Sequence, residues 1–525
     1  MKKKYYFPLL LLIILVGSGK ITGQHQNIEI NSWGSPNEPT IMIDPQNTDI
    51  VVAASNLNLY YYSSDGGKTW TVNTLSSPYG VWGDPVMVVD TAGHFYFFHL
   101  SNPPNDSWID RIVCQKSTDG GKNWSPGTFM GKNGSKAQDK HWAVVDRNNN
   151  HIYVTWTQFD KCGSTSHQDS SHIMFSMSSD GGDSWLPAKR INQKGGDCID
   201  SDDTVEGAVP AVGPNGEIYV SWAAHEKIYF DKSFDQGQSW QEQDQVIAEM
   251  PGGWDIDIPG IMRSNGFPVT LCDLSGGPAH GTIYINWADQ RNGTNDTDIW
   301  LIKSVDQGET WSEPVRVNDD PPGKHQFFTW MTIDQTNGNI YIVYYDRSNY
   351  ADNQTDVYLA RSTDGGESFR NMRISESPFY PIENIFFGDY NNITAHNGVV
   401  RPIWTRLHSG KLSLYTALVD LSKFEEVSIE IVDHQDNTLE QNYPNPFSDT
   451  TYISFKIPKD SILSLDILDT QGNHLVNIFR NKPFGQGQHI VELKDEVKSL
   501  PSGTYIYLLK SGDQIYRKKM ISINQ

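Results

Sequence analysis

Short hydrophobic runs recur in groups along the first 420 residues. A group opens with a run such as "TIMID" or "WAVVD" and continues with one such as "IVVAAS" or "IYVTW". A third run, such as "LYYY" or "IWLIK", follows, and a short segment such as "VRVN" closes the group. Runs of this length, separated by turn sequences such as "GPNGE", predict β-strands. Each group therefore predicts four antiparallel strands, which form one blade of a β-propeller.

An octet follows the third run in six of the groups. The copies are "SSDGGKTW", "STDGGKNW", "SSDGGDSW", "SFDQGQSW", "SVDQGETW" and "STDGGESF", and they start 54 to 71 residues apart. A period of this size indicates a repeat architecture. We predict a structural hairpin between the third and fourth strands, because a turn Asp accepts hydrogen bonds from turn amides. The carboxylates assigned to this structural role are Asp65, Asp119, Asp180, Asp235, Asp306 and Asp364.

A seventh, partial group decides the number of blades. The segment "YNNITAHNGVVRPIWTRLHSGKLSLYTALVD" supplies three strands without an octet, and "NIEINSW" near the N-terminus supplies a fourth. A ring closed by strands from both ends leaves no open sheet edge. We expect an all-β fold with a seven-bladed propeller over residues 24–420; six blades are the alternative.

The two ends of the chain have a different texture. "MKKK" followed by "FPLLLLIILVG" has the form of a signal peptide, which we place at residues 1–23. Residues 421–441 form a linker. Residues 442–525 alternate apolar and polar positions in "ISFKI", "LSLDIL" and "TYIYLLK", which predicts a small Ig-like β-sandwich.

Composition narrows the choice of partners. The net charge of -22 argues against nucleic acid, whose binding depends on neutralising phosphates. No segment after the signal peptide approaches 18 apolar residues, so we expect no transmembrane segment in the mature chain. Cys162 and Cys198 both lie in predicted loops, and a disulfide between them is one of two readings. Cys114 and Cys272 lie in predicted strands and are expected to be buried thiols.

The octets resemble the Asp-box (BNR) repeat, S-x-D-x-G-x-T-W, over about residues 25–420. That repeat occurs in sialidases and other glycoside hydrolases, and also in non-enzymatic propellers such as sortilin-type receptors. The resemblance implies an Asp-box propeller and leaves the activity open.

The tail resembles the type A C-terminal sorting domain of the type IX (Por) secretion system of Bacteroidetes. "NYPNPF" and "LPSGTYIY", followed by the basic "RKKM", match the markers of that family. The resemblance implies export across the outer membrane, with the type IX machinery as a partner. The protein is then either released or attached to the cell surface.

Charged residues gather at the loops of the face opposite the octets, around the mouth of the channel. Arginines bind carboxylates through two hydrogen bonds, and a carboxylate can act as general acid or base. This set indicates chemistry on a glycan. The candidate catalytic residues are Asp84, Asp139, Glu206 and Tyr390. The candidate substrate-binding residues are Glu38, His141, Arg291, Arg347 and Arg406.

The order Asp84, Glu206, Arg291, Arg347, Tyr390 is similar to the order of the functional residues in sialidases. The resemblance implies a Tyr nucleophile with a carboxylate neighbour and arginines that bind the substrate carboxylate. The chain departs from that family at "NEP", where Glu38 stands in place of the first arginine. Arg406 from the last blade is a candidate replacement.

The working hypothesis is an exported, glycan-directed glycoside hydrolase that acts on a carbohydrate or glycoprotein. A non-catalytic glycan- or protein-binding propeller and a polysaccharide lyase are the alternatives. No cofactor is required by this hypothesis. Two loops rich in oxygen ligands, "RNGTNDTD" and "ADNQTD", are candidate calcium sites.

Overall fold

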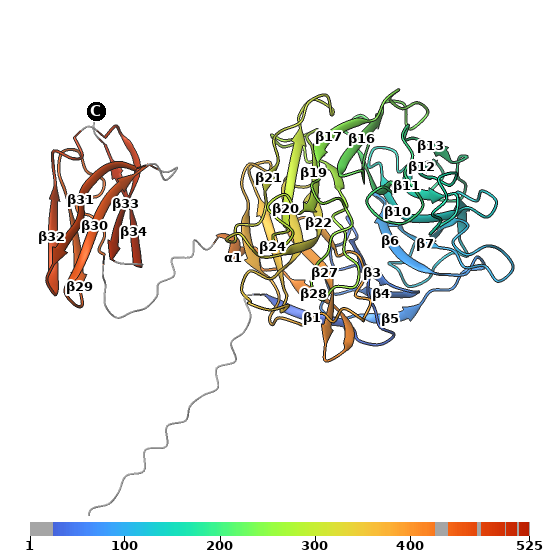
Figure 1. The fold of residues 1–525 in the computed structure, drawn as a ribbon, viewed down its shortest axis with the longest axis horizontal. Coiled ribbons are helices and arrows are strands. Elements are labelled where there is room, and N and C mark those ends of the chain that lie inside the picture. Colours follow the sequence, from blue (N-terminus) through green and yellow to red (C-terminus); the bar gives the residue numbers. More distant parts are fainter. Residues whose placement is uncertain (1–24, 426–438, 470–473, 499, 512–513, 524–525) are drawn as a thin grey trace, which may run out of the picture. The chain divides into compact units, whose positions relative to one another are not determined.

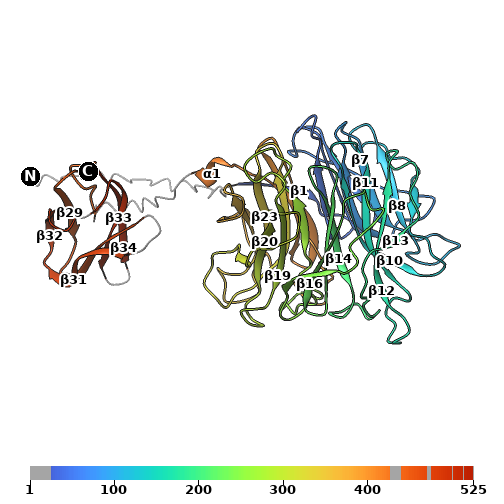
Figure 2. The same ribbon diagram turned by 90° about the horizontal axis from the view of Figure 1, so that it is seen from above.

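A computed structural model describes residues 25–425, 439–469, 474–498, 500–511 and 514–523. The chain divides into two compact units, Met1–Glu425 and Glu426–Gln525. The expected signal peptide, and residues 426–438 of the expected linker, lie outside the described residues. Nearly every described element is a β-strand. Figures 1 and 2 show the strands of the first unit grouped in successive sheets that follow the order of the chain.

The described part of the first unit contains seven four-stranded antiparallel sheets, which we number blade 1 to blade 7. In blades 1 to 6 the strand order within the sheet is the order along the chain. Blade 1 contains β2 (Thr40–Ile43), β3 (Val51–Ser55), β4 (Leu59–Ser63) and β5 (Thr71–Thr74). Blade 2 contains β6 (Gly83–Val89), β7 (Phe95–Leu100), β8 (Ile112–Ser117) and β9 (Thr128–Met130). Blade 3 contains β10 (Ala137–Val145), β11 (Ile152–Phe159), β12 (Ser171–Ser178) and β13 (Lys189–Arg190).

The next three blades repeat this arrangement. Blade 4 contains β14 (Glu206–Val212), β15 (Ile218–Ala224), β16 (Lys227–Ser233) and β17 (Gln245–Glu249). Blade 5 contains β18 (Val269–Cys272), β19 (Ile283–Asp289), β20 (Asp298–Ser304) and β21 (Val315–Arg316). Blade 6 contains β22 (Gln326–Asp334), β23 (Asn339–Asp346), β24 (Asp356–Ser362) and β25 (Arg370–Arg373).

Blade 7 joins the two ends of the propeller. It contains β26 (Asn392–His396), β27 (Val399–His408) and β28 (Lys411–Leu418), and its fourth strand is β1 (Gln26–Asn31). β1 runs antiparallel to β28, with Gln26 opposite Leu418, and the two strands lie side by side in Figure 1. A short helix, α1 (Ser422–Glu425), follows. The N-terminal segment therefore pairs with the C-terminal blade, as the partial seventh group predicted.

The core lies between neighbouring blades. The second strands of blades 3, 4, 5 and 7 each contribute a fully buried tryptophan, which is why "IYVTW" and its relatives recur in the sequence. Burial of large aromatic side chains is a strong source of folding free energy. These tryptophans are Trp156, Trp222, Trp287 and Trp404.

The six octets form hairpins between the third and fourth strands, as predicted. In blade 1 the Ser63 hydroxyl donates to Asp65 Oδ1 at 2.7 Å, and the Thr69 amide donates to the same oxygen at 2.9 Å. Burial opposes ionisation, yet these bonds lower the pKa of Asp65 to about 2. The other five octets repeat the Ser–Asp bond. Each Asp is thus engaged within its own hairpin.

The octet tryptophans join adjacent blades. The Trp124 ring packs edge-on against Tyr60 of blade 1 and Phe97 of blade 2, with centroid distances of 5.9 and 5.5 Å. The hairpin and the side chain that ends it therefore hold two sheets together.

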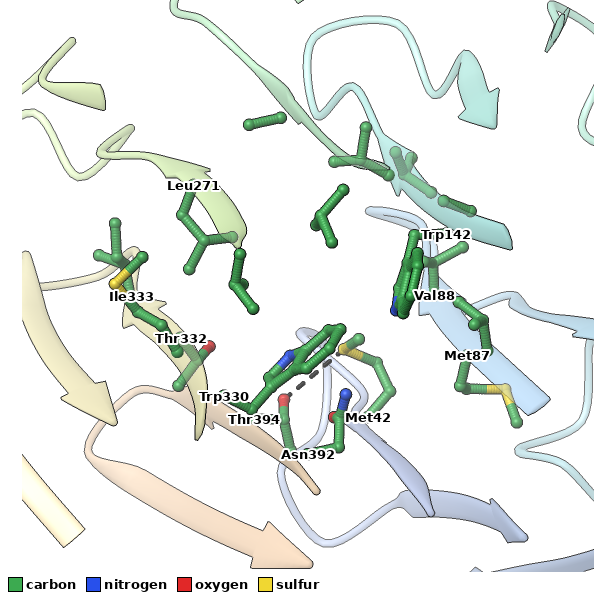
Figure 3. Close-up of a pocket in the computed structure, with 18 of the residues that line it drawn as sticks. Met42, Met87, Val88, Trp142, Leu271, Trp330, Thr332, Ile333, Asn392 and Thr394 are labelled. Carbon is green, nitrogen blue, oxygen red and sulfur yellow. Dashed lines mark hydrogen bonds between the residues drawn. The ribbon is translucent and has the colours of Figure 1, made fainter. Parts of the chain in front are cut away.

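The first strands surround a central cavity of about 210 Å³ (Figure 3). Its wall is largely apolar and includes Met42, Met87, Val88, Leu271 and Ile333. Three aromatic rings lie at the end that faces the mouth: Trp142, Trp330 and Tyr390, with centroid distances of 6.0 to 6.4 Å. These rings separate the apolar cavity from the charged residues described below.

The second unit is a two-layer β-sandwich. One layer pairs β29 (Thr451–Ile457) with β32 (Gly487–Leu493). The other has the order β31 (His474–Phe484), β30 (Ser461–Leu468), β33 (Gly503–Ser511) and β34 (Gln514–Ser522). A shared core that includes Phe455, Leu465 and Tyr507 lies between the layers.

Candidate functional site

The first strands of four blades are bulged where they meet the mouth. The pairing register shifts at Gly83/Val86, Asp139/Trp142, Glu206/Val209 and Phe327/Trp330. A bulge bends a strand and redirects its side chains, and bulges are enriched next to functional sites. Within these register shifts the backbone takes the left-handed conformation at Asp84 (φ 51°) and Lys140 (φ 46°). Glu38, just before the first strand of blade 1, has the same conformation (φ 50°). The three charged side chains therefore emerge from an unusual backbone that blades share.

An ion-pair network occupies the centre of the mouth. The Lys140 ammonium lies 2.7 Å from Asp389 and 3.5 Å from Asp84. Arg263 binds the Asp389 carboxylate with two nitrogens, Nε at 3.0 Å and Nη2. Asp389 is almost fully buried, and burial works against its ionisation, but Lys140 and Arg263 lower its pKa to about 2. Asp389 is therefore an ionised carboxylate between two cations.

Lys140 is charged for the same reason. Burial disfavours the ammonium, but Asp389 and Asp84 more than offset this and raise the pKa of Lys140. Removal of either partner would leave a buried cation without compensation.

A second set of carboxyl groups beside this network has pKa values that are shifted in the opposite direction, upward. Burial and the nearby Asp84 raise the pKa of Asp139 to about 7. Burial, with Asp200 as the next cause, raises the pKa of Glu206 well above its usual range. Neither carboxylate oxygen of Glu206 has a hydrogen-bond partner among the described residues. Burial and Asp84 likewise raise the pKa of Glu38.

These opposite shifts place proton-holding and ionised carboxyl groups in one site. Pairs of carboxyl groups whose environments separate their pKa values mark the acid and the base of an active site. Solvent reaches only part of the set: Asp139 is half-buried and the Asp84 side chain is 15% exposed, whereas Glu38, Glu206 and Asp389 are buried. Asp84 and Asp139, together with Asp200, whose side chain is 33% exposed, are therefore the carboxyl groups that a ligand in the mouth can reach.

Tyr390 and His141 lie at the same place but are enclosed. The Tyr390 ring packs against Trp142 and Trp330, and its hydroxyl group has no hydrogen-bond partner in the part of the chain that the structure describes. Burial, followed by the charge of Asp84, raises the pKa of this hydroxyl. Burial also lowers the pKa of His141 to about 4. The expected carboxylate partner of a tyrosine nucleophile is absent here, because no described carboxylate accepts a hydrogen bond from Tyr390.

The three arginines expected at the mouth are held by other partners. Arg291 donates to both oxygens of Asp289 and lies 4.3 Å from the centre of the Trp300 ring. Arg347 donates to the carbonyl of Pro259 at 2.7 Å and lies over Phe327. Arg406 donates to the carbonyl of Ser377 and lies over Tyr415. These contacts bind each arginine to neighbouring loops and rings rather than to the carboxylate cluster.

Four members of the cluster are not among the sequence candidates: Lys140, Asp200, Arg263 and Asp389. Arg263 and Asp200 come from the long loops that precede blades 5 and 4, and their charges are 3.5 Å apart. Neither Arg263 nor Asp200 is adjacent to a strand. A position beside a strand, which marks the sequence candidates, therefore does not mark these two residues. The only sequence feature that indicates these segments is the length of the loops before blades 4 and 5.

The disulfide between Cys162 and Cys198 is a wrong prediction, because both cysteines are free. A backbone bridge pairs Cys198 with Ser164, not with Cys162. The loops that carry the two cysteines meet, but their register places Ser164, and not Cys162, opposite Cys198. Cys114 and Cys272 are buried thiols, as expected.

The candidate calcium loops direct their carboxylates to protein groups. Asp298 accepts hydrogen bonds from Asn292 and Arg316, and Asp296 accepts from the amides of Gly323 and Lys324. Within the described ranges no cluster of three or more His, Cys, Asp or Glu residues is arranged to hold a metal ion. Calcium binding stays a prediction.

Comparison with known families agrees with the two resemblances. Residues 441–524 match the secretion system C-terminal sorting domain, and residues 61–72 match the BNR/Asp-box repeat. No curated protein matches the sequence. The chain is an Asp-box β-propeller followed by a sorting domain of the type IX secretion system, and this domain indicates export by that system. No helix among the described residues is long and apolar enough to cross a membrane.

Several solved structures have a similar course of the chain. A protein of unknown function from Dyadobacter fermentans is 13% identical, with a TM-score of 0.42 over 61% of this chain and 94% of that one. The NanB sialidase from Streptococcus pneumoniae is 11% identical, with a TM-score of 0.43 over 70% and 83%. The α-L-arabinanase of Penicillium chrysogenum is 15% identical, with a TM-score of 0.41 over 63% and 97%.

Proposed function

We propose that the exported propeller is a glycoside hydrolase that acts on a carbohydrate or glycoprotein, with Asp139 as general acid and Asp84 as general base. The observation that carries the proposal is the reachable Asp139, whose pKa of about 7 keeps a proton available beside a second reachable carboxylate. Hydrolysis of a glycosidic bond requires such a pair. Both residues project from bulged first strands of adjacent blades, which fixes their backbones.

In the proposed reaction Asp139 transfers its proton to the glycosidic oxygen while the bond from that oxygen to the anomeric carbon breaks. Water adds to the anomeric carbon, and Asp84 takes the proton that this water loses. The transition state resembles an oxocarbenium ion. Proton transfer from Asp84 to Asp139 through solvent then restores the starting state, so that one water is consumed for each bond cleaved.

The remaining cluster residues have positioning roles in this proposal. Lys140 follows Asp139 directly, its amide donates to Asp139 Oδ1 at 2.8 Å, and its ammonium lies 3.5 Å from Asp84. The buried Asp389 accepts a hydrogen bond from the same ammonium and so holds it beside Asp84, one of the two reactive carboxyl groups. Tyr390 has no catalytic role here, because its hydroxyl is buried and its raised pKa keeps it neutral.

The proposal is tested by turnover of a panel of glycosides and polysaccharides with the full chain and its isosteric variants. We expect Asp139→Asn and Asp84→Asn each to lower kcat by roughly 10²–10⁴-fold, the usual contribution of a general acid or base. Asp257→Asn, a change of an exposed carboxylate in the loop that precedes blade 5, is the matched control and should leave kcat unchanged. Glycan binding without turnover by the wild-type chain would contradict the proposal and favour a binding propeller.

A further inference from the structure

Two tryptophans stand exposed on neighbouring loops of blade 2. Trp82 lies before β6 and is 38% exposed; Trp108 lies between β7 and β8 and is 46% exposed. Their ring centroids are 5.8 Å apart and their planes meet at 89°. The pair presents a sizeable apolar surface to solvent. Exposed aromatic surface of this kind marks an interaction site more often than a structural one.

The position of the pair relative to the reactive carboxyl groups is set by the backbone. Trp82 precedes Asp84 by two residues. On the other side, the carbonyl of Ile109, next to Trp108, accepts a hydrogen bond at 2.7 Å from the amide of Gln138, which precedes Asp139. Each tryptophan is thus linked to one of the two carboxyl groups proposed as acid and base.

The loop that carries Trp108 is held by charged side chains. Arg111 binds Asp110 with two nitrogens at 2.6 and 2.7 Å and also reaches Asp106 at 2.7 Å. The Ser101 hydroxyl donates to Asp110 at 2.9 Å, and Lys132 pairs with Asp106. A ligand surface that is ordered before binding loses less entropy when the ligand arrives.

The charges of the mouth indicate what kind of sugar fits. The two cations of the cluster, Lys140 and Arg263, are both bound to Asp389. A carboxylate on the substrate would have to compete with Asp389 for them. It would also approach the carboxylates of Asp84 and Asp200, and like charges at close range repel. The mouth therefore disfavours sialic acids and uronates.

We propose that the substrate is an uncharged glycan and that one of its sugar rings packs against the Trp82–Trp108 pair beside the reactive carboxyl groups. The inference rests on the proposed function for its choice of a glycan. It narrows the unspecified glycan of the proposed function to neutral sugars. The apolar face of a sugar ring packs against an aromatic ring. The hydroxyl groups of the sugar then remain free to meet the carboxyl groups of the cluster.

The test measures binding, not turnover, with the full chain. Affinity electrophoresis and calorimetry compare neutral polysaccharides (arabinan, xylan, mannan and laminarin) with acidic probes (polygalacturonate, alginate and sialyllactose). We expect binding to a neutral probe, and Trp82→Ala and Trp108→Ala each to weaken it roughly tenfold or more, as expected for loss of a large apolar contact. Phe234→Ala removes an even more exposed aromatic, 59% exposed on an octet hairpin of the opposite face, and should bind like the wild type.

Trp82→Phe should recover most of the lost affinity, because a smaller aromatic still offers a stacking surface. Preferred binding of the acidic probes, no binding to any probe, or neutral binding that both alanine variants retain would overturn the inference. Asp139-dependent turnover of an acidic glycan would overturn the inference while the proposed function stands. Trp-dependent binding of a neutral glycan without turnover would support the inference and overturn the proposed function. A thermal melt of each variant verifies that it is folded.

Discussion

At the scale of single residues, the site depends on how burial and charge divide six carboxyl groups. Asp389 ionises because Lys140 and Arg263 surround it. Near the same lysine, burial and like charges raise the pKa of Asp139 to about 7 and raise the pKa of Glu206 as well. The same residue type thus has opposite protonation within one cluster. That division gives the proposed acid its proton at neutral pH.

The pH dependence of turnover follows from Asp139. The acid must hold its proton, so we expect kcat/KM to fall as the pH rises through about 7, with a slope of one proton. A pH–rate profile of the full chain measures this. A profile that stays flat from pH 6 to 9 would contradict the assignment of Asp139.

Stability should change over the same range. The unfolded pKa of Asp is about 3.9, and the folded value of Asp139 is raised to about 7. Between these values the folded state binds more protons, so the contribution of Asp139 to stability decreases as the pH rises through this window. Asp139→Asn removes this contribution. The decrease in Tm from pH 5 to pH 8 should therefore be smaller in the variant, and Asp257→Asn serves as its control.

At the scale of the element, the octet hairpins hold neighbouring blades together through their glycines. Gly121 has φ +79°, and a Cβ there would lie 2.7 Å from Val52 Cγ2 in β3 of blade 1. Gly134 has φ +63°, and a Cβ there would meet nothing within 4 Å. Both glycines have a left-handed backbone, but only at Gly121 would an added Cβ contact the neighbouring blade.

Gly121→Ala and Gly134→Ala therefore form a matched pair. Both should lose about 1–2 kcal/mol of unfolding free energy from the left-handed backbone. Gly121→Ala should lose about 1–3 kcal/mol more, because its methyl group overlaps the neighbouring blade. Chemical denaturation monitored by tryptophan fluorescence measures the difference. Equal losses would show that the hairpin packs loosely against blade 1.

At the scale of the whole molecule, the chain is a propeller whose last blade joins its two ends, together with a separate sorting sandwich. The sandwich has its own core, which includes Phe455 and Tyr507, and its family match assigns it to secretion. The chemistry described above uses only residues of the first unit. The family match therefore indicates that the second unit directs export.

Deletion of residues 439–525 should prevent export across the outer membrane and leave the propeller folded. Cell fractionation with an antibody against the propeller, in a host with the type IX system, measures the location. The truncated protein should be absent from the medium and the cell surface. The Asp139→Asn full chain, which retains the address, should be exported normally. Export of the truncated protein would contradict the assigned role of the tail.

Much of the architecture was accessible from the sequence because it depends on local rules. Alternation of apolar and polar residues sets a strand, and the octet sets the hairpin that follows it. The period predicts the repeat, and the place of β1 as the fourth strand of blade 7 follows from counting the strands. Several candidates at the mouth were accessible for the same reason. Asp84, Asp139 and Glu206 lie at the start of first strands and Glu38 just before one, and the structure brings these carboxyl groups together.

The sequence by itself therefore determined the repeat, the strands, the face that carries the site and four of its carboxyl groups, because each depends on a periodic position along the chain. Only the tertiary structure decided which cations meet those groups. Arg291 and Arg347 follow second strands and bind nearby loops, whereas Arg263 reaches Asp389 from a long loop without periodicity. It also decided the protonation of each carboxyl group, the enclosure of Tyr390 and the absence of the Cys162–Cys198 bond. Burial and distance set these properties, and neither is a function of position in the sequence.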